Sequence, residues 1–401
     1  MNRTAHSAGT ASLHASSRLL TRTFVLACAV QLTGSLAGAM YILFPLFVRS
    51  LGGTETTIGV LAGLGAASAV AIRWPLGVLL DRVGRKPIMI AATLCHMASS
   101  VGFLFVGELG RWCELLVMLN AMAAGAMFTS FVTYAADIVP VTRRAQGLAW
   151  FGMWGMMANG LSPLLGEWLQ RTGGFQAYFL AAAALASACA SIIVWLPNPR
   201  MQRFEVAPTE SRQRLHSGFV FLLALTMLFG AAEASVFTFL APFLTSQGEG
   251  NVGPVFFAYA GAAVLVRVVS SHLPDRIGRL RVLAASFTLY GAALLAIPRI
   301  SGELPHLVTG VLAGIGHGYA FPILAALVVD LAGGRRGRAV SWFTAMFDVG
   351  HSLSNPVLGA LAEHFGYRAM YTVVGAFALA SAALIVRGGR QRPAQPSTSI
   401  T

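Results

Sequence analysis

The chain has 401 residues, of which 56% are hydrophobic and 11% are charged, and its mean hydropathy is +0.69. Soluble domains carry about 25% charged residues, so this composition excludes an ordinary water-soluble fold. The net charge of +13 does not indicate nucleic-acid binding, because the basic residues form short clusters between apolar runs and no continuous stripe with interleaved aromatic side chains.

The single lysine and the scattered cysteines exclude two further kinds of site. An ATP-binding P-loop needs Gly-Lys-Ser or Gly-Lys-Thr, whereas Lys86 lies between Arg85 and Pro87. The four cysteines lie singly in apolar segments and have neither metal-ligand nor redox spacing. We therefore expect no ATP, no metal and no cofactor.

The chain begins with a Ser-, Thr-, Ala- and His-rich stretch, 1–20, which is followed by the apolar run Phe24–Val48. That run is longer than the core of a signal peptide, which has about 7–15 residues. The sequence predicts a disordered cytoplasmic tail and then an uncleaved first helix.

Apolar runs long enough to cross about 30 Å of hydrocarbon recur along the rest of the chain. Six predicted spans cover 22–49, 55–79, 87–107, 112–137, 146–170 and 175–196, and six more cover 218–246, 252–273, 280–298, 305–332, 337–362 and 367–387. The sequence predicts an all-α membrane protein of twelve transmembrane helices. Its six-helix halves, 21–196 and 218–387, are joined by a cytoplasmic linker, 197–217, and followed by a cytoplasmic tail, 388–401.

Orientation follows from the positions of arginine and lysine, which concentrate in cytoplasmic loops. With both termini inside, the opposite loops hold five of the 28 basic residues, namely Arg49, Arg111, Arg171, Arg299 and Arg368. Arg73 and Arg267 fall within spans, and the rest lie on the cytoplasmic side. We predict that both termini are cytoplasmic and that the membrane is the inner membrane of a bacterium.

The two halves repeat one another. The segment Arg73–Arg85 reappears as Arg267–Arg279, with Arg, Asp, Arg, Gly and Arg in register. Further along, Asp137 with Arg143 and Arg144 corresponds to Asp330 with Arg336. Because each copy has an even number of spans, the copies share one orientation and are related by an axis along the membrane normal.

The loop after the second span has the pattern G-x-x-x-D-R-x-G-R-K, formed by Gly77, Asp81, Arg82, Gly84, Arg85 and Lys86. With this motif the chain resembles the major facilitator superfamily from about Thr21 to Arg387. A second copy is formed by Asp275, Arg276, Gly278 and Arg279, with Ser271 at the position of the first glycine. The resemblance implies the major facilitator fold, in which the two halves rock around a central site.

Both copies of the motif are predicted to gate the cytoplasmic side. A glycine permits the tight turn between two helix ends, and Asp81 can pair with Arg85. We expect a charge relay beside them, formed by Asp137, Arg143, Arg144, Asp330 and Arg336. The alternative is that these basic residues act only by setting the topology.

The tenth and eleventh spans carry the segments Gly314–Leu324 and Phe347–Gly359, which look like the arabinose-efflux-permease and drug-exporter branch of the family. This resemblance implies export of a small molecule.

Charges inside the spans mark the candidate site, because each costs about 2.5–3.5 kcal/mol to insert. Glu233 and His317 lie at middle depth on helices that the family places around its cavity, so we predict that they exchange protons or contact substrate. Arg267, the repeat partner of Arg73, is predicted to attract an anionic group. For Glu233 and His317 the alternative is simple helix packing.

Arg73 and Asp348 are predicted to form an ion pair between the halves. Arg73 lies eight residues before Asp81, about 12 Å inside the cytoplasmic helix end, and Asp348 lies about 15 Å inside from the same side. In the resembling fold the second and eleventh helices pack together. The pair is either a gate, present in one access state, or a permanent structural contact.

These observations favour a proton-coupled exporter of a small organic molecule. Two alternatives stay open: an uptake symporter for a sugar or organic acid, and a non-transporting receptor or membrane enzyme. The expected partners are a small-molecule substrate, protons and the lipid bilayer, with neither nucleic acid nor ATP, and we expect a monomer.

Overall fold

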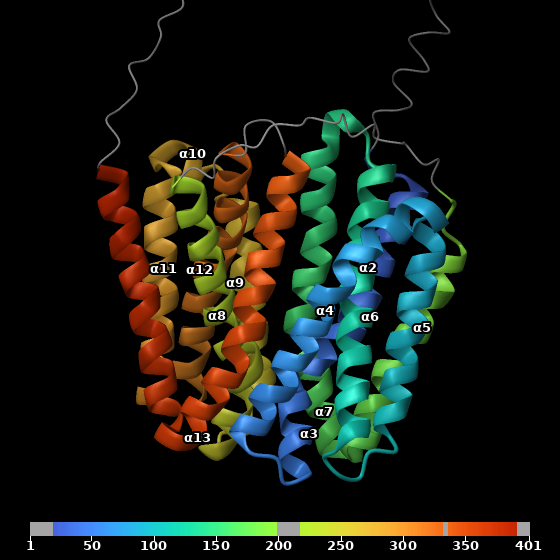
Figure 1. Ribbon diagram of the computed structural model, residues 1–401, viewed down its shortest axis with the longest axis horizontal. Helices are drawn as coiled ribbons and strands as arrows, with labels where there is room; N and C mark the ends of the chain where they lie inside the picture. The colour runs from blue at the N-terminus through green and yellow to red at the C-terminus, as the bar shows by residue number, and fades with distance from the viewer. Residues whose placement is uncertain (1–18, 199–216, 332–335, 391–401) are drawn as a thin grey trace, which may run out of the picture. The chain divides into compact units, whose positions relative to one another are not determined.

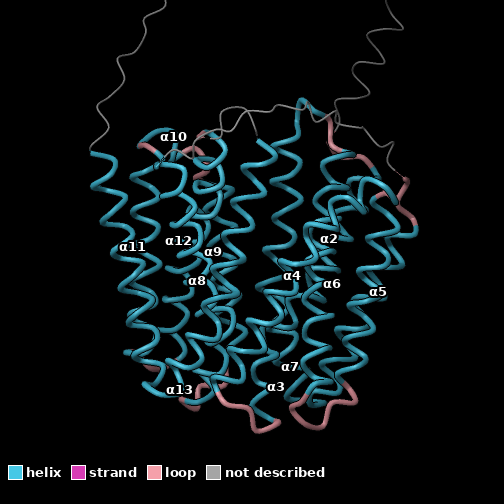
Figure 2. Tube along the Cα trace, viewed as in Figure 1, coloured by secondary structure: helices cyan, strands magenta, loops and turns pink. Residues whose placement is uncertain are grey.

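The computed structural model describes residues 19–198, 217–331 and 336–390. Within these ranges the chain is helical, with short connecting loops and no strand (Figure 2). Most of both predicted tails and of the predicted linker, 197–217, lies outside the described residues. The chain divides into two compact units, residues 1–213 and 214–401.

The first unit begins with α2 (Arg22–Met40), which continues through the short helix η1 (Tyr41–Leu43) into α3 (Phe44–Ser50). It continues with α4 (Glu55–Val83), α5 (Arg85–Phe103), α6 (Arg111–Ile138), η2 (Val141–Arg143) and α7 (Arg144–Val194) (Figure 1). Thr21 starts α2 because its hydroxyl accepts the Phe24 amide hydrogen, which has no partner within the helix.

The second unit contains α8 (Ser217–Ser246), α9 (Val252–Val269), α10 (Leu273–Ile277) and α11 (Arg279–Ala296). It ends with η3 (Ile297–Arg299), α12 (Glu303–Asp330) and α13 (Arg336–Arg390). The units share one packing pattern: α2 packs on α7 and α4 on α6, as α8 packs on α13 and α9 on α12. The helix pairs therefore match the internal repeat of the sequence.

The described residues contain nine helices that are long and apolar enough to cross a membrane. Two of them, Gln146–Val194 and Ala339–Arg387, have 49 residues each and break at Gly174 and Gly366, where φ is 66° and 80°. Each therefore supplies two crossings. With the 19-residue α5 the number of crossings is twelve, which confirms the predicted fold class.

The predicted span 252–273 is too long. α9 ends at Val269, and the separate short helix α10 begins at Leu273. Pro274 lies in the first turn of α10, where its missing N–H costs nothing. Ser270 ends α9, with its hydroxyl 3.0 Å from the Val266 carbonyl oxygen and 2.5 Å from the Tyr319 hydroxyl. The corresponding part of the first unit lies within the continuous helix α4.

Candidate functional site

Three polar side chains meet inside the second unit: Glu233 on α8, Tyr259 on α9 and His317 on α12. The Nδ1 atom of His317 contacts Oε1 of Glu233. The Tyr259 hydroxyl lies 2.8 Å from the same nitrogen and donates to Glu233 Oε1 at 3.3 Å. All three residues are buried, with Glu233 5% and His317 7% exposed. We call this group the Glu–Tyr–His cluster.

Glycines on α12 set the distance between this helix and α9. A Cβ on Gly310 would lie 2.7 Å from the Val255 carbonyl oxygen, and one on Gly318 would lie 3.0 Å from that of Ala263. A Cβ on Gly314 would collide with the Tyr259 carbonyl oxygen. The four-residue spacing of these glycines lets the two backbones approach closely. This approach brings the Tyr259 hydroxyl within reach of His317.

Aromatic rings surround the cluster. The His317 ring stacks on Phe321, with centroids 5.9 Å apart and planes inclined by 5°, and its centroid is 5.7 Å from that of Phe229. A carboxylate and an imidazolium in such surroundings stabilise each other, because each alone would be a buried charge without water. A change of protonation at one therefore alters the energy of the other.

Arg267 lies on the same helix as Tyr259 but does not join the cluster. It follows Tyr259 by eight residues, about 12 Å along α9. Its Nε donates to the Gly318 carbonyl oxygen at 3.3 Å, and the side chain is half-buried. Among the three predicted proton-coupling or substrate residues, Glu233 and His317 are thus in contact, and Arg267 is separate. Their roles stay predictions.

Tyr259 is the member of the cluster that sequence reasoning missed. A tyrosine in an apolar span gives no signal of its own, because it is ordinary in helix packing. A signal was available in the glycines of α12 at four-residue spacing, which indicate that another helix lies close to His317.

The first copy of the charged motif forms a compact ion-pair network. Gly84, with φ of 98°, makes the turn between α4 and α5 in a conformation that favours glycine. Arg85 is 7% exposed and contacts Asp81 at 3.0 Å and Asp137 at 2.9 Å. Lys86 donates to the carbonyl oxygens of Val194 and Leu196, both at 2.7 Å, where a cation stabilises the end of α7.

The second copy repeats the arginine–aspartate contacts of the first, and its arginine and its second aspartate are more exposed. Arg279 contacts Asp275 at 3.4 Å and Asp330 at 2.7 Å, and Gly278 makes the turn with φ of 100°. The side chain of Arg279 is 41% exposed, and that of Asp330 is 59% exposed. Within each unit the motif arginine therefore contacts an aspartate at the C-terminal end of the fourth membrane-spanning helix, which is α6 in the first unit and α12 in the second.

The remaining motif residues make fewer contacts in the structure. Arg82 and Arg276 are exposed, and a Cβ on Gly77 would meet no atom within 4 Å, so packing within its unit does not require this glycine. Of the residues in the predicted charge relay, Asp137 contacts Arg85 in the first unit, and Asp330 contacts Arg279 in the second. Arg143 is exposed, Arg144 begins α7, and the side chain of Arg336 lies outside the description. Gating and relay stay predictions.

The predicted ion pair connects residues of different units. Arg73 lies on α4 and is half-buried in the first unit, and Asp348 lies on α13 and is half-buried in the second. Each unit is described by itself, so this pair also stays a prediction.

A sequence profile of the Major Facilitator Superfamily matches residues 23–276 and 223–400. The chain is 24% identical over 383 residues to the multidrug resistance protein MdtG of Erwinia billingiae, covering 90% of this chain and 91% of MdtG. It is also 24% identical over 359 residues to the multi-drug resistance efflux pump PmrA of Streptococcus pneumoniae, covering 85% of this chain and 89% of PmrA.

Among solved structures, that of the peptide transporter POT in complex with sulfate has a TM-score of 0.78 and 14% sequence identity, covering 94% of this chain and 97% of that chain. This likeness shows the fold. Because the profile matches nearly the whole chain, the chain belongs to the Major Facilitator Superfamily. It is a membrane-spanning transporter and not an enzyme.

Proposed function

We propose that this transporter exports a small organic molecule in exchange for protons, and that the Glu–Tyr–His cluster binds the proton. The observation that carries the proposal is the contact between a buried carboxylate and a buried imidazole on two different membrane-spanning helices. Buried ionisable residues in such helices are characteristic of proton pathways. The relatives named for multidrug resistance and efflux support the export direction.

The contact between Glu233 and His317 couples protonation to helix movement. With one proton between them the two groups are neutral as a pair, either as carboxylate and imidazolium or as carboxylic acid and imidazole. A second proton leaves a neutral carboxylic acid beside a cationic imidazolium, and the attraction between α8 and α12 is lost. Proton binding therefore favours a different arrangement of the two helices, as alternating access requires.

Sidedness is part of the same proposal. The distribution of arginine and lysine supports cytoplasmic termini in a bacterial inner membrane. Protons then enter the cluster from outside and leave toward the cytoplasm while substrate moves outward, and a monomer is sufficient for this cycle.

The test is transport by purified protein in liposomes of known orientation, with an imposed pH gradient and a panel of labelled amphipathic cations, anions and zwitterions. Glu233→Gln should reduce gradient-driven transport about tenfold or more, because the group whose charge changes is absent. The same variant should still exchange labelled for unlabelled substrate without a gradient, since a neutral side chain imitates the protonated carboxyl.

Glu108→Gln is the matched control, because Glu108 is an exposed carboxylate in the loop between α5 and α6. It should leave transport unchanged. Full gradient-driven transport by Glu233→Gln would overturn the coupling proposal. If substrate moved in the same direction as the protons, the conclusion would change from an exporter to an uptake symporter.

A further inference from the structure

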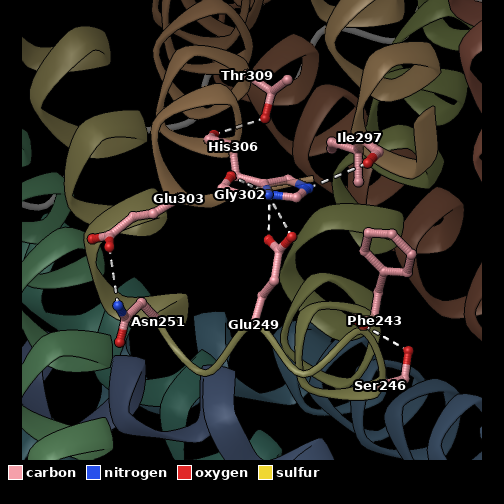
Figure 3. Close-up of polar contacts among 9 residues, drawn as sticks. All are labelled: Phe243, Ser246, Glu249, Asn251, Ile297, Gly302, Glu303, His306 and Thr309. Carbon is pink, nitrogen blue, oxygen red and sulfur yellow. Dashed lines mark hydrogen bonds and ion pairs between the residues drawn. The ribbon is translucent and has the colours of Figure 1, made fainter. Parts of the chain in front are cut away.

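A second histidine–carboxylate pair lies at one end of the helices that carry the Glu–Tyr–His cluster. His306 is in the first turn of α12, and Glu249 is in the turn between α8 and α9 (Figure 3). His306 Nδ1 and Glu249 Oε2 are 2.6 Å apart, and His306 is 1% exposed. We call these two residues the terminal His–Glu pair.

Both ring nitrogens of His306 face hydrogen-bond acceptors. Nδ1 lies 2.9 Å from the Gly302 carbonyl oxygen in addition to the Glu249 carboxylate, and Nε2 lies 3.3 Å from the Ile297 carbonyl oxygen. A neutral imidazole has one N–H, and only the protonated ring donates from both nitrogens. The acceptors around this buried ring therefore suit the imidazolium, which has an N–H to donate from each nitrogen.

The carboxylate of Glu249 is held from a second direction. Its Oε1 accepts the Gly302 amide hydrogen at 2.5 Å, at the N-terminus of α12, where the helix dipole favours a negative charge. Gly302 has no side chain with which to cap the helix, and Glu249 instead accepts the amide hydrogen of Gly302 itself from the neighbouring turn. One carboxylate thus connects the α8–α9 turn to both the backbone and the imidazole of α12.

Other charged and titratable groups near the ring have their own partners. Glu303, on the same helix, accepts a hydrogen bond from Asn251 at 3.1 Å (Figure 3). Arg299 of η3 donates to the Leu295 carbonyl oxygen and to the Thr372 hydroxyl. From α8 the ring meets Phe243, with centroids 6.4 Å apart, and Tyr367 of α13 packs against the same phenylalanine. Glu249 is the carboxylate that the described contacts place against His306.

We propose that the terminal His–Glu pair is a second proton-binding site, which holds the α8–α9 turn against α12 while His306 is protonated. Among ordinary side chains histidine is the one that gains and loses a proton most readily near neutral pH, and loss of the proton from His306 removes the charge-assisted contact. With the cytoplasmic termini proposed above from the distribution of basic residues, this end of the unit lies outside the cytoplasm, and the pair then responds to external pH.

Continuous helices connect the terminal His–Glu pair to the Glu–Tyr–His cluster, so a change of protonation at the pair affects the cluster. His306 and His317 are eleven residues apart on α12, about 16 Å. The turn that carries Glu249 joins α8 with Glu233 to α9 with Tyr259. Acidic external conditions therefore keep the ends of all three cluster helices together, and alkaline conditions release them.

Amide hydrogen exchange of the full-length protein in lipid nanodiscs tests the proposal without a substrate. Exchange is measured at pH 5.5 and pH 8 and corrected for the intrinsic pH dependence of the reaction. Peptides covering 247–251 and 302–306 should exchange about tenfold or more faster at pH 8, because the contact that protects them is lost. Equal corrected rates at the two pH values would overturn the proposal.

Variants separate the imidazole from the rest of the fold. His306→Gln should make the corrected exchange of both peptides independent of pH. His364→Gln, which removes an exposed histidine beside the Gly366 break of α13, should behave as the wild type. If His306→Gln does not fold, Glu249→Gln keeps an acceptor for the Gly302 amide and should also remove the pH dependence. Wild-type pH dependence in either folded variant would contradict the proposal.

Discussion

The buried hydroxyl of Tyr259 contacts two groups that can exchange a proton, Glu233 and His317, and its removal is a small change in volume. Tyr259→Phe keeps the ring, which packs edge-on against Phe237 with centroids 5.6 Å apart. We expect a properly folded protein in which gradient-driven transport falls about three- to tenfold and its pH profile shifts, because Glu233 and His317 lose a shared hydrogen-bond partner. Transport measured from pH 5.5 to 8 checks this prediction.

Tyr371 provides the matched control at the residue scale. It is also buried in the second unit, and its hydroxyl donates to the Ser235 carbonyl oxygen at 3.1 Å, a group that does not titrate. Tyr371→Phe should cost about 1 kcal/mol of stability and leave the pH profile unchanged. Equal pH profiles for both variants would mean that Tyr259 is only a packing residue.

At the scale of helices and their ends, the two copies of the motif make the same arginine–aspartate contacts, but these contacts differ in burial. Asp137 is 5% exposed beside a 7% exposed Arg85, so Asp137→Asn breaks a buried pair and should cost about 3–5 kcal/mol. Asp330 is 59% exposed beside a 41% exposed Arg279, so Asp330→Asn should cost about 0–1 kcal/mol. Thermal unfolding of both variants in the same detergent measures the difference.

The comparison is informative because the two substitutions are chemically identical and occupy equivalent positions of the repeat. A similar loss of stability in both would show that burial does not decide the strength of these pairs. A larger loss of stability for Asp330→Asn would show that the second copy of the motif contributes more to the stability of the fold than the first.

At the scale of the whole molecule, the proposal concerns a contact between the units. We propose that Arg73 and Asp348 pair between the halves, as their depths in the membrane, which agree within one helical turn, predict. Arg73→Ala and Asp348→Ala should each lower transport about tenfold, because one charge inside the membrane loses its counter-ion. The charge-swapped double variant should recover part of the activity in the same liposome assay.

Non-additivity gives the decisive comparison for that pair. If the residues interact, the double alanine variant should lose less than the product of the two single losses. Fully multiplicative losses, together with no recovery by the charge swap, would exclude the contact.

Much of the fold could be predicted because lipid imposes strong rules on sequence. Each span must be apolar for about 20 residues, and basic residues concentrate on one side. The twelve crossings, the turn glycines Gly84 and Gly278, and the contact of Asp81 with Arg85 follow from local pattern and appear in the structure. The end of α9 at Val269 was missed, because apolar composition continues past the point where the backbone breaks.

The site depended on contacts that no local pattern contains. Glu233 and His317 were identified singly from the cost of ionisable groups in a membrane, but their contact with each other and with Tyr259 depends on how closely α8, α9 and α12 pack. His306 and Glu249 lie 57 residues apart, one at the start of a predicted span and the other in the loop between two predicted spans, so nothing in their surroundings marked them as a pair. Hydropathy acts along the chain and determines the spans, whereas proton-binding groups are assembled by side chains from different helices, which only the packed fold brings together.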